Sequence, residues 1–213
     1  MAAYLGGILD EVAGDPPVPI TVWRAVAADD PHPAAPGRLT PFLARRLIAT
    51  YSRRGGTVVD LDADPPLRHA ATAGGRGYLP VTRPADLAGL DSSGDVDLIT
   101  TRWPRPDPVP ATAVIDLFHA CRLVLGRRGH AAVIVDPPPG TPYLEFGHEL
   151  VPAAARAGMG YLQHIIAVLA PIVGDTITAP TPDSQAYQVA AANGIHVKVH
   201  LDMLIFVVGG SDA

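Results

Sequence analysis

The sequence predicts an α/β protein built on a mostly parallel sheet. Apolar runs of strand length alternate with amphipathic stretches of helical length along most of the chain, which is the pattern of such folds. Residues 57–61 form an apolar run typical of a strand buried on both faces of a parallel sheet. The chain has 213 residues, of which 48% are hydrophobic, so one domain can bury a full core.

The first forty residues differ in character from the rest. Residues 5–12 have the spacing of a short amphipathic helix and residues 20–26 that of a short strand, and a proline-rich stretch follows. We therefore expect an N-terminal arm over residues 1–39 and an α/β domain over residues 40–213. Thr40 is a typical N-cap and Pro41 suits a first helical turn, which predicts a helix over residues 41–51.

The remaining elements alternate along the domain. After the strand at 57–61 we expect strands over residues 77–81, 96–100, 130–136, 161–169 and 195–208, and helices over residues 111–125, 143–157 and 184–193. The last two strands are expected to be antiparallel neighbours, because only one short helix connects them.

Composition limits the classes of function. The net charge of -5 and the pI near 5.8 argue against a strongly basic nucleic-acid-binding surface, although local basic patches stay open. The single cysteine, Cys121, excludes an internal disulfide and a cysteine-based zinc cluster. No apolar run is long enough for a membrane helix, and no basic leader opens the chain, so we expect no membrane contact and a cytoplasmic location.

Several segments together resemble the class I S-adenosylmethionine (SAM)-dependent methyltransferases. Asp30-Pro-His-Pro precedes the helix that ends in Tyr51-Ser and leads to the strand Thr57-Val-Val-Asp-Leu. Asp95-Val-Asp-Leu-Ile-Thr-Thr is similar to the strand before the catalytic turn, and Val199-His-Leu-Asp-Met-Leu-Ile-Phe-Val-Val to the final strand. Over residues 30–208 the amino-acid sequence is similar to that of the exocyclic-amine DNA methyltransferases, which modify adenine or cytosine amino groups. The resemblance implies a Rossmann-like methyltransferase sheet, mostly parallel with an antiparallel C-terminal strand.

The loop after the first strand departs from that family. In the family an acid and a glycine-rich loop let the backbone approach the methionine part of SAM. Asp60 takes the place of the acid, but residues 62–66 read Asp-Ala-Asp-Pro-Pro, and proline fixes φ and lacks an N–H donor. Asp62 also brings negative charge toward the carboxylate of the ligand. Gly74 and Gly75 come later, where we expect them to cap a following helix.

The second strand of the family ends in an acid that binds the ribose hydroxyls. Alignment places Thr82 there, and a threonine cannot offer two acceptor oxygens. Only about 14 residues separate Val81 from Val96, whereas a helical crossover alone needs about a dozen. We therefore expect that one strand and one helix of the family fold are shortened or deleted.

The catalytic turn of the family is a polar residue, two prolines and an aromatic residue, which bind and stack on a flipped base. At this place the chain has Thr-Arg-Trp-Pro-Arg, in which Pro104 is retained, the ring of Trp103 is offset by about two positions, and Arg102 would repel the sulfonium. We expect these three residues to form a structural or interaction loop.

The two loops should also face each other, because both follow the carboxyl ends of neighbouring strands. We expect the aspartates at the end of the first strand and in the loop after it to pair with the arginines of the degenerate catalytic turn and so to close the cofactor pocket of the family. The residues concerned are Asp60, Asp62, Asp64, Arg102 and Arg105.

No metal site is expected. His196, Lys198, His200 and Asp202 alternate with apolar residues and so share one strand face. His196 and His200 are about 13 Å apart on a strand, too far to bind one ion. Only His200 and Asp202 are close enough, and a solvated or loop-covered face is the favoured interpretation.

Two functions fit these observations. The sequence favours a degenerate DNA-methyltransferase-like protein that is non-catalytic, binds no cofactor and acts as a scaffold or binding partner of a protein, of a second copy or of nucleic acid. The alternative is an active SAM-dependent methyltransferase acting on DNA or another amine, in which Asp60, Asp62, Thr82 and Trp103 hold cofactor and target. A nicotinamide dehydrogenase is excluded by the lack of a Gly-x-Gly-x-x-Gly fingerprint.

Overall fold

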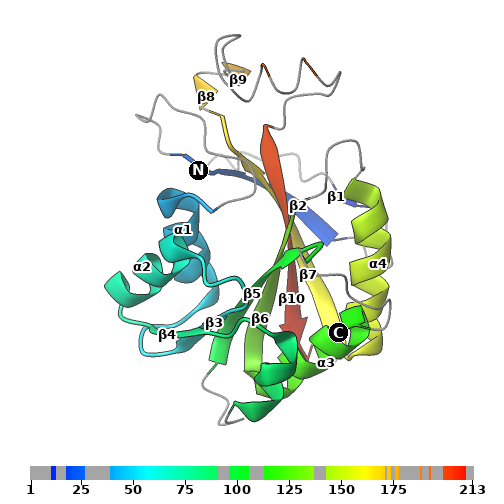
Figure 1. Cartoon of the computed structure of the whole chain (residues 1–213). Coiled ribbons are helices and arrows are strands. Elements are labelled where there is room, and N and C mark those ends of the chain that lie inside the picture. The colour runs from blue at the N-terminus through cyan, green and yellow to red at the C-terminus, as the bar shows by residue number, and fades with distance from the viewer. Residues whose placement is uncertain are drawn as a thin grey trace, which may run out of the picture.

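An eight-stranded sheet runs through the middle of the protein (Figure 1). The structure is a computed structural model, and it describes residues 11–12, 18–26, 39–90, 96–105, 113–136, 143–170, 172–173, 176–177, 188, 192 and 199–209. The strand order is β1-β2-β7-β10-β6-β5-β3-β4, with bounds β1 Glu11–Val12, β2 Val18–Arg24, β3 Thr57–Asp60, β4 Gly77–Pro80, β5 Val96–Trp103, β6 Leu125–Val135, β7 Met159–Val168 and β10 His200–Val208. A separate pair is formed by β8 (Ile172–Val173) and β9 (Thr176–Ile177).

The strand directions confirm the predicted sheet. β3, β5 and β6 are adjacent and parallel, with Val59 opposite Ile99 and Thr100 opposite Ala132. β10 lies antiparallel between β6 and β7. The sheet is therefore mostly parallel, with an antiparallel strand at the C-terminal end of the fold.

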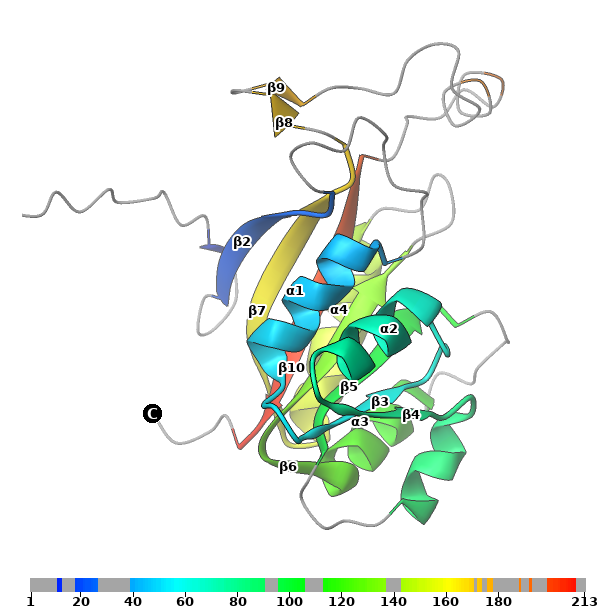
Figure 2. The same ribbon diagram turned by 90° about the vertical axis from the view of Figure 1, so that its left-hand side faces the viewer.

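Helices cover both faces of the sheet. α1 (Pro41–Tyr51) and α2 (Pro65–Ala73) pack on one face, as Figure 2 shows. α3 (Ala113–Val124), α4 (Tyr143–Arg156) and the 3-10 helix η1 (Pro84–Gly89) belong to the other. Each face has its own buried core, around Leu47, Val58 and Ile205 on the α1 side and around Phe118, Leu150 and Phe206 on the α3 side.

α1 begins and ends where the sequence predicts. Thr40 accepts a hydrogen bond from the backbone N–H of Leu43, and Pro41 occupies the first turn, where its missing N–H costs nothing. The helix ends at Tyr51, and Ser52 donates its hydroxyl to the carbonyl of Ile48.

α2 was not expected, and the prediction for the two glycines was wrong. Pro65 and Pro66 stand in the first turn of this helix, where proline is favoured, instead of in an extended loop. Gly74 is the C-cap of α2, and Gly75 follows it at φ +73°, so the glycines end a preceding helix and cap no following one.

The segment between β4 and β5 is short, as expected. Among its described residues it contains η1 of six residues, and β4 forms the edge of the sheet. Several predicted strand bounds differ by a residue or two, and two differ more for strands described throughout: β5 continues to Trp103, and β6 already starts at Leu125, where a helix was expected to end.

The N-terminal part contributes to the sheet. β2 pairs in parallel with β7, and Glu11 and Val12 pair with β2 as strand β1 instead of ending a helix. The division into an arm and a domain at residue 40 stays a prediction. The helix expected over residues 184–193 lies almost wholly outside the described residues.

Candidate functional site at the carboxyl edge of the sheet

Asp60, the last residue of β3, organises the loop that follows it. Its carboxylate is buried and accepts hydrogen bonds from the backbone N–H groups of Asp62 (3.0 Å) and Asp64 (2.6 Å). It also accepts from the hydroxyls of Tyr78 (2.7 Å) and Thr100 (3.3 Å). The oxygens of Asp60 are therefore already used to fix a tight turn between β3 and α2.

The turn after Asp60 contains a positive φ angle, as a glycine loop does, although it has no glycine. Ala63 has φ +50°, in the left-handed region that residues other than glycine rarely adopt. The chain therefore follows the path of a tight turn, but a methyl group stands in place of the glycine hydrogen, and an aspartate flanks it on each side.

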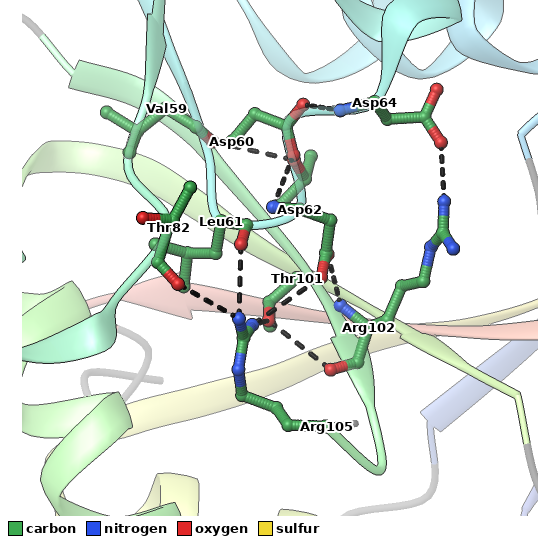
Figure 3. Close-up of polar contacts among 10 residues, drawn as sticks. Val59, Asp60, Leu61, Asp62, Asp64, Thr82, Thr101, Arg102 and Arg105 are labelled. Carbon is green, nitrogen blue, oxygen red and sulfur yellow. Dashed lines mark hydrogen bonds and ion pairs between the residues drawn. The ribbon is translucent and has the colours of Figure 1, made fainter. Parts of the chain in front are cut away.

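Arg102 connects the end of β5 with this loop (Figure 3). Its Nη2 lies 2.7 Å from Oδ2 of the buried Asp64, and its backbone N–H donates to Oδ2 of Asp62 at 2.7 Å. The predicted facing of the two loops is confirmed. The side-chain partner of Arg102 is Asp64, however, while Asp62 binds only its backbone N–H.

Arg105 makes the second and more central bridge. Its side chain is only 9% exposed, and its Nη1 lies 3.5 Å from Oδ1 of Asp62. Nη1 also donates to the hydroxyl of Thr101 at 2.9 Å, and Nη2 donates to the carbonyls of Leu61 and Thr82, both at 3.2 Å. One guanidinium thus connects the ends of β3, β4 and β5 (Figure 3).

Burial decides the direction in which the pKa of Asp62 is shifted. Burial raises the pKa of Asp62 above its usual value, and this outweighs the lowering by Arg105, by the N–H of Arg102 and by the charge of Arg102. The ion pair alone would predict a lowered pKa. Burial wins because the carboxylate has lost most of its water, and the Arg105 contact at 3.5 Å is long.

The three residues at the predicted catalytic turn are placed differently from one another. Arg102 and Trp103 belong to β5, so they stand on a strand and not in the expected loop, whereas Pro104 comes just after it. Trp103 is buried in the core on the α3 side, and its indole N–H donates to Glu149 at 2.9 Å. In this position its ring has no free face for stacking on a base.

Thr82 follows β4 with an exposed side chain, and only its carbonyl takes part in the network. The vestigial cofactor roles suggested for Asp60, Asp62 and Thr82 stay predictions.

A second buried polar cluster lies on β7 and β10. Asp202 is 2.9 Å from Nε2 of His164 and 3.5 Å from Nε2 of His200. We expected a solvated or loop-covered strand face; His200 is exposed, whereas Asp202 is buried and His164 on β7 reaches it. His196 and Lys198 lie outside the described residues. Within the described residues, no group of three histidine, cysteine, aspartate or glutamate side chains could hold a metal ion.

The Asp202 cluster leads to a pH-dependent stability. Burial alone would raise the pKa of Asp202, but hydrogen bonds with His164 and His200 outweigh it and hold the pKa at about 2. An aspartate in an unfolded chain titrates near 3.9. The stabilisation is therefore complete above about pH 4 and is lost as the pH falls toward 2. We expect the wild type to lose about 2 kcal/mol more of unfolding free energy over this interval than Asp202→Asn, measured by urea titration. Equal losses would contradict this role.

The fold of this chain is similar to that of solved SAM-dependent methyltransferases. Geranyl diphosphate methyltransferase in complex with GPP and sinefungin is 12% identical, with 89% of this chain and 90% of that chain aligned at a TM-score of 0.50. A SAM-dependent methyltransferase from Archaeoglobus fulgidus is 11% identical, with 79% of this chain and 94% of that chain aligned at a TM-score of 0.47. The chain has the class I methyltransferase fold. No family model matches the sequence, and no curated protein matches it significantly.

Identity at this level shows the methyltransferase fold alone. It does not single out the DNA-modifying enzymes that the sequence resembles. The carboxyl edge of the sheet is where open α/β folds bind their ligands, and in this methyltransferase fold it is crossed by the Arg102 and Arg105 bridges.

Sequence reasoning missed three contributors to this edge, Tyr78, Thr101 and Glu149, whose spacing gives no sign of their partners. It also missed Gly126-Arg127-Arg128-Gly129, where two adjacent arginines between glycines could have indicated a basic loop.

No helix among the described residues has the length and apolar character needed to cross a membrane.

Proposed function

We propose that this methyltransferase-fold protein does not transfer methyl groups and acts as a scaffold or binding partner. The observation that supports the proposal is the Arg105 guanidinium, which is held between the carbonyls of Leu61 and Thr82. These residues belong to the two loops that face the methionine and ribose parts of SAM in the family that the sequence resembles. A cation in this space would also repel the positive sulfonium of SAM.

Calorimetric titration with SAM and with S-adenosylhomocysteine tests the proposal. We expect no saturable binding below about millimolar ligand, because SAM must first break the contacts of Arg105. A micromolar constant would mean about 8 kcal/mol of binding free energy and would restore the active methyltransferase as the better interpretation.

A variant distinguishes a SAM pocket that is closed by Arg105 from a chain that has no SAM pocket. Arg105→Met removes the guanidinium but keeps most of the apolar volume, and Arg83→Met is the matched control, because Arg83 is exposed and pairs with Asp86 instead. Weak saturable SAM binding by Arg105→Met alone would support a site closed by this side chain. Micromolar binding by the control and the wild type would refute the proposal.

We propose that the partner of this scaffold is another protein, a second copy of this chain or nucleic acid, and that the protein acts in the cytoplasm.

A further inference from the structure

An open groove of about 1260 Å³ lies at the opposite, amino edge of the parallel strands. It is formed by the end of α1, the start of β5 and β6, and the end of β10. The residues that give it its chemistry are Ser52, Arg53, Asp97, Arg127, Arg128 and Gly209. None of them belongs to the ionic network at the carboxyl edge.

A bulge in β6 places two arginines beside this groove. Val96 pairs with Leu125 and Leu98 with His130, so β6 has four residues between the paired positions where β5 has only Asp97. The extra chain is Gly126-Arg127-Arg128-Gly129, and both arginines are exposed. The bulge depends on glycine, since a Cβ on Gly129 would lie 2.9 Å from the Cβ of Leu125.

The charge of the groove is positive although the chain is acidic overall. Asp97 is the only carboxylate among the described lining residues, and Arg53 already neutralises it. Nη2 and Nε of Arg53 bind Oδ1 of Asp97 at 2.7 and 3.0 Å, and the N–H of Arg53 binds Oδ2 at 2.8 Å. Neither Arg127 nor Arg128 has an ion pair with any residue that the structure describes. Two positive charges therefore face the groove without a counter-charge from the described chain.

The lining suits phosphate groups better than a protein surface. Phosphate oxygens are bound above all by arginine and lysine side chains, and the groove offers the exposed guanidinium groups of Arg127 and Arg128. Protein interfaces are centred on buried aromatic and large apolar side chains instead. Among the described lining residues, the phenol ring of Tyr51 could serve, but it is buried and packs against His130, with ring centroids 5.1 Å apart.

We propose that this groove binds the sugar-phosphate backbone of single-stranded nucleic acid. A single strand is flexible enough to enter a groove, whereas a duplex stays stiff over about 150 base pairs. The described lining residues include no exposed aromatic ring for stacking, so binding is electrostatic and independent of base sequence. The inference goes beyond the proposed function, because it names a partner at a different edge and holds whether or not SAM binds.

Fluorescence anisotropy of a labelled 16-nucleotide oligouridine with the full chain tests the proposal. We expect binding at 50 mM salt that weakens about sevenfold at 200 mM, from two phosphate contacts at about 0.7 of a counterion each. Arg127→Ala/Arg128→Ala should weaken binding at 50 mM salt by at least about tenfold and remove most of the salt dependence. Both side chains are exposed, so the variant should melt at the temperature of the wild type.

The matched control is Arg45→Ala/Arg68→Ala, which removes two exposed arginines from α1 and α2 that do not line the groove. It makes the same change in net charge and should bind like the wild type. The proposal is overturned if both double variants lose equal affinity, if the wild type does not bind at 50 mM salt, or if a duplex or a polyglutamate peptide of equal length binds more tightly. SAM titrations leave this test unaffected, so either proposal can fail alone.

Discussion

Val59→Asp is expected to unfold the domain. Val59 is 0% exposed on β3, opposite Leu79 on β4 and Ile99 on β5. An aspartate there would bury a carboxylate among apolar side chains without a partner, which costs several kcal/mol. A domain of this kind has only about 5–15 kcal/mol of stability. Far-UV circular dichroism at pH 7 should show loss of the native spectrum, and a urea titration should show no cooperative transition.

The chain offers a matched control on another strand. Val22 on β2 is 61% exposed, so Val22→Asp makes the same chemical change in a strand without burying the charge. We expect it to change the unfolding free energy by less than about 1 kcal/mol. A folded Val59→Asp with a urea midpoint near that of Val22→Asp would mean that β3 is not a buried central strand.

Arg102→Met is expected to cost about 3 kcal/mol of unfolding free energy. Asp64 is 4% exposed, and its Oδ2 is bound by Arg102 at 2.7 Å. Its Oδ1 has no hydrogen-bond partner among the described residues. Removing the arginine therefore leaves a buried carboxylate without a counter-charge, which is the costly way to break a buried pair. The urea midpoint measures the loss.

A double-mutant cycle of Arg102→Met with Asp64→Asn isolates the interaction free energy between the two side chains from their interactions with other residues. We expect a coupling free energy of about 1–3 kcal/mol between Asp64 and Arg102. The control is Arg83→Met, which breaks the exposed pair with Asp86 and should cost no more than about 1 kcal/mol. If Arg102→Met costs no more than this control, the Arg102–Asp64 bridge does not hold the carboxyl edge closed, and Arg105 alone is left to support the proposed function.

The sheet was predictable because its signals are local and repeated. The apolar runs that became β3, β5 and β6 need both faces covered, and only a parallel sheet between helices provides this. The pairing of aspartates with arginines was also predictable, since the ends of neighbouring parallel strands meet at one edge. Which arginine meets which aspartate was not, because β5 continues past the expected turn and moves Arg102 onto the strand.

The remaining differences have distinct physical causes. Pro65 and Pro66 are compatible with a loop and with a first helical turn, and only the packing of Leu67 and Ala71 under α1 decides for the helix. The basic groove could not be predicted from the sequence for a different reason. Arg127 and Arg128 follow a helix end in the sequence, and the bulge that presents them forms only when β6 pairs with β5.

The position of β10 in the sheet has a consequence for synthesis on the ribosome. β10 comes after all the other described strands in the sequence, yet it lies between β6 and β7 and bonds to both. Until it emerges, these two strands each expose an unpaired edge, which is a template for pairing with other chains. The 31 residues between Val168 and His200 take about 2 to 6 seconds to translate at the usual elongation rates. The nascent protein is therefore most exposed to aggregation, and most dependent on chaperones, just before β10 leaves the exit tunnel.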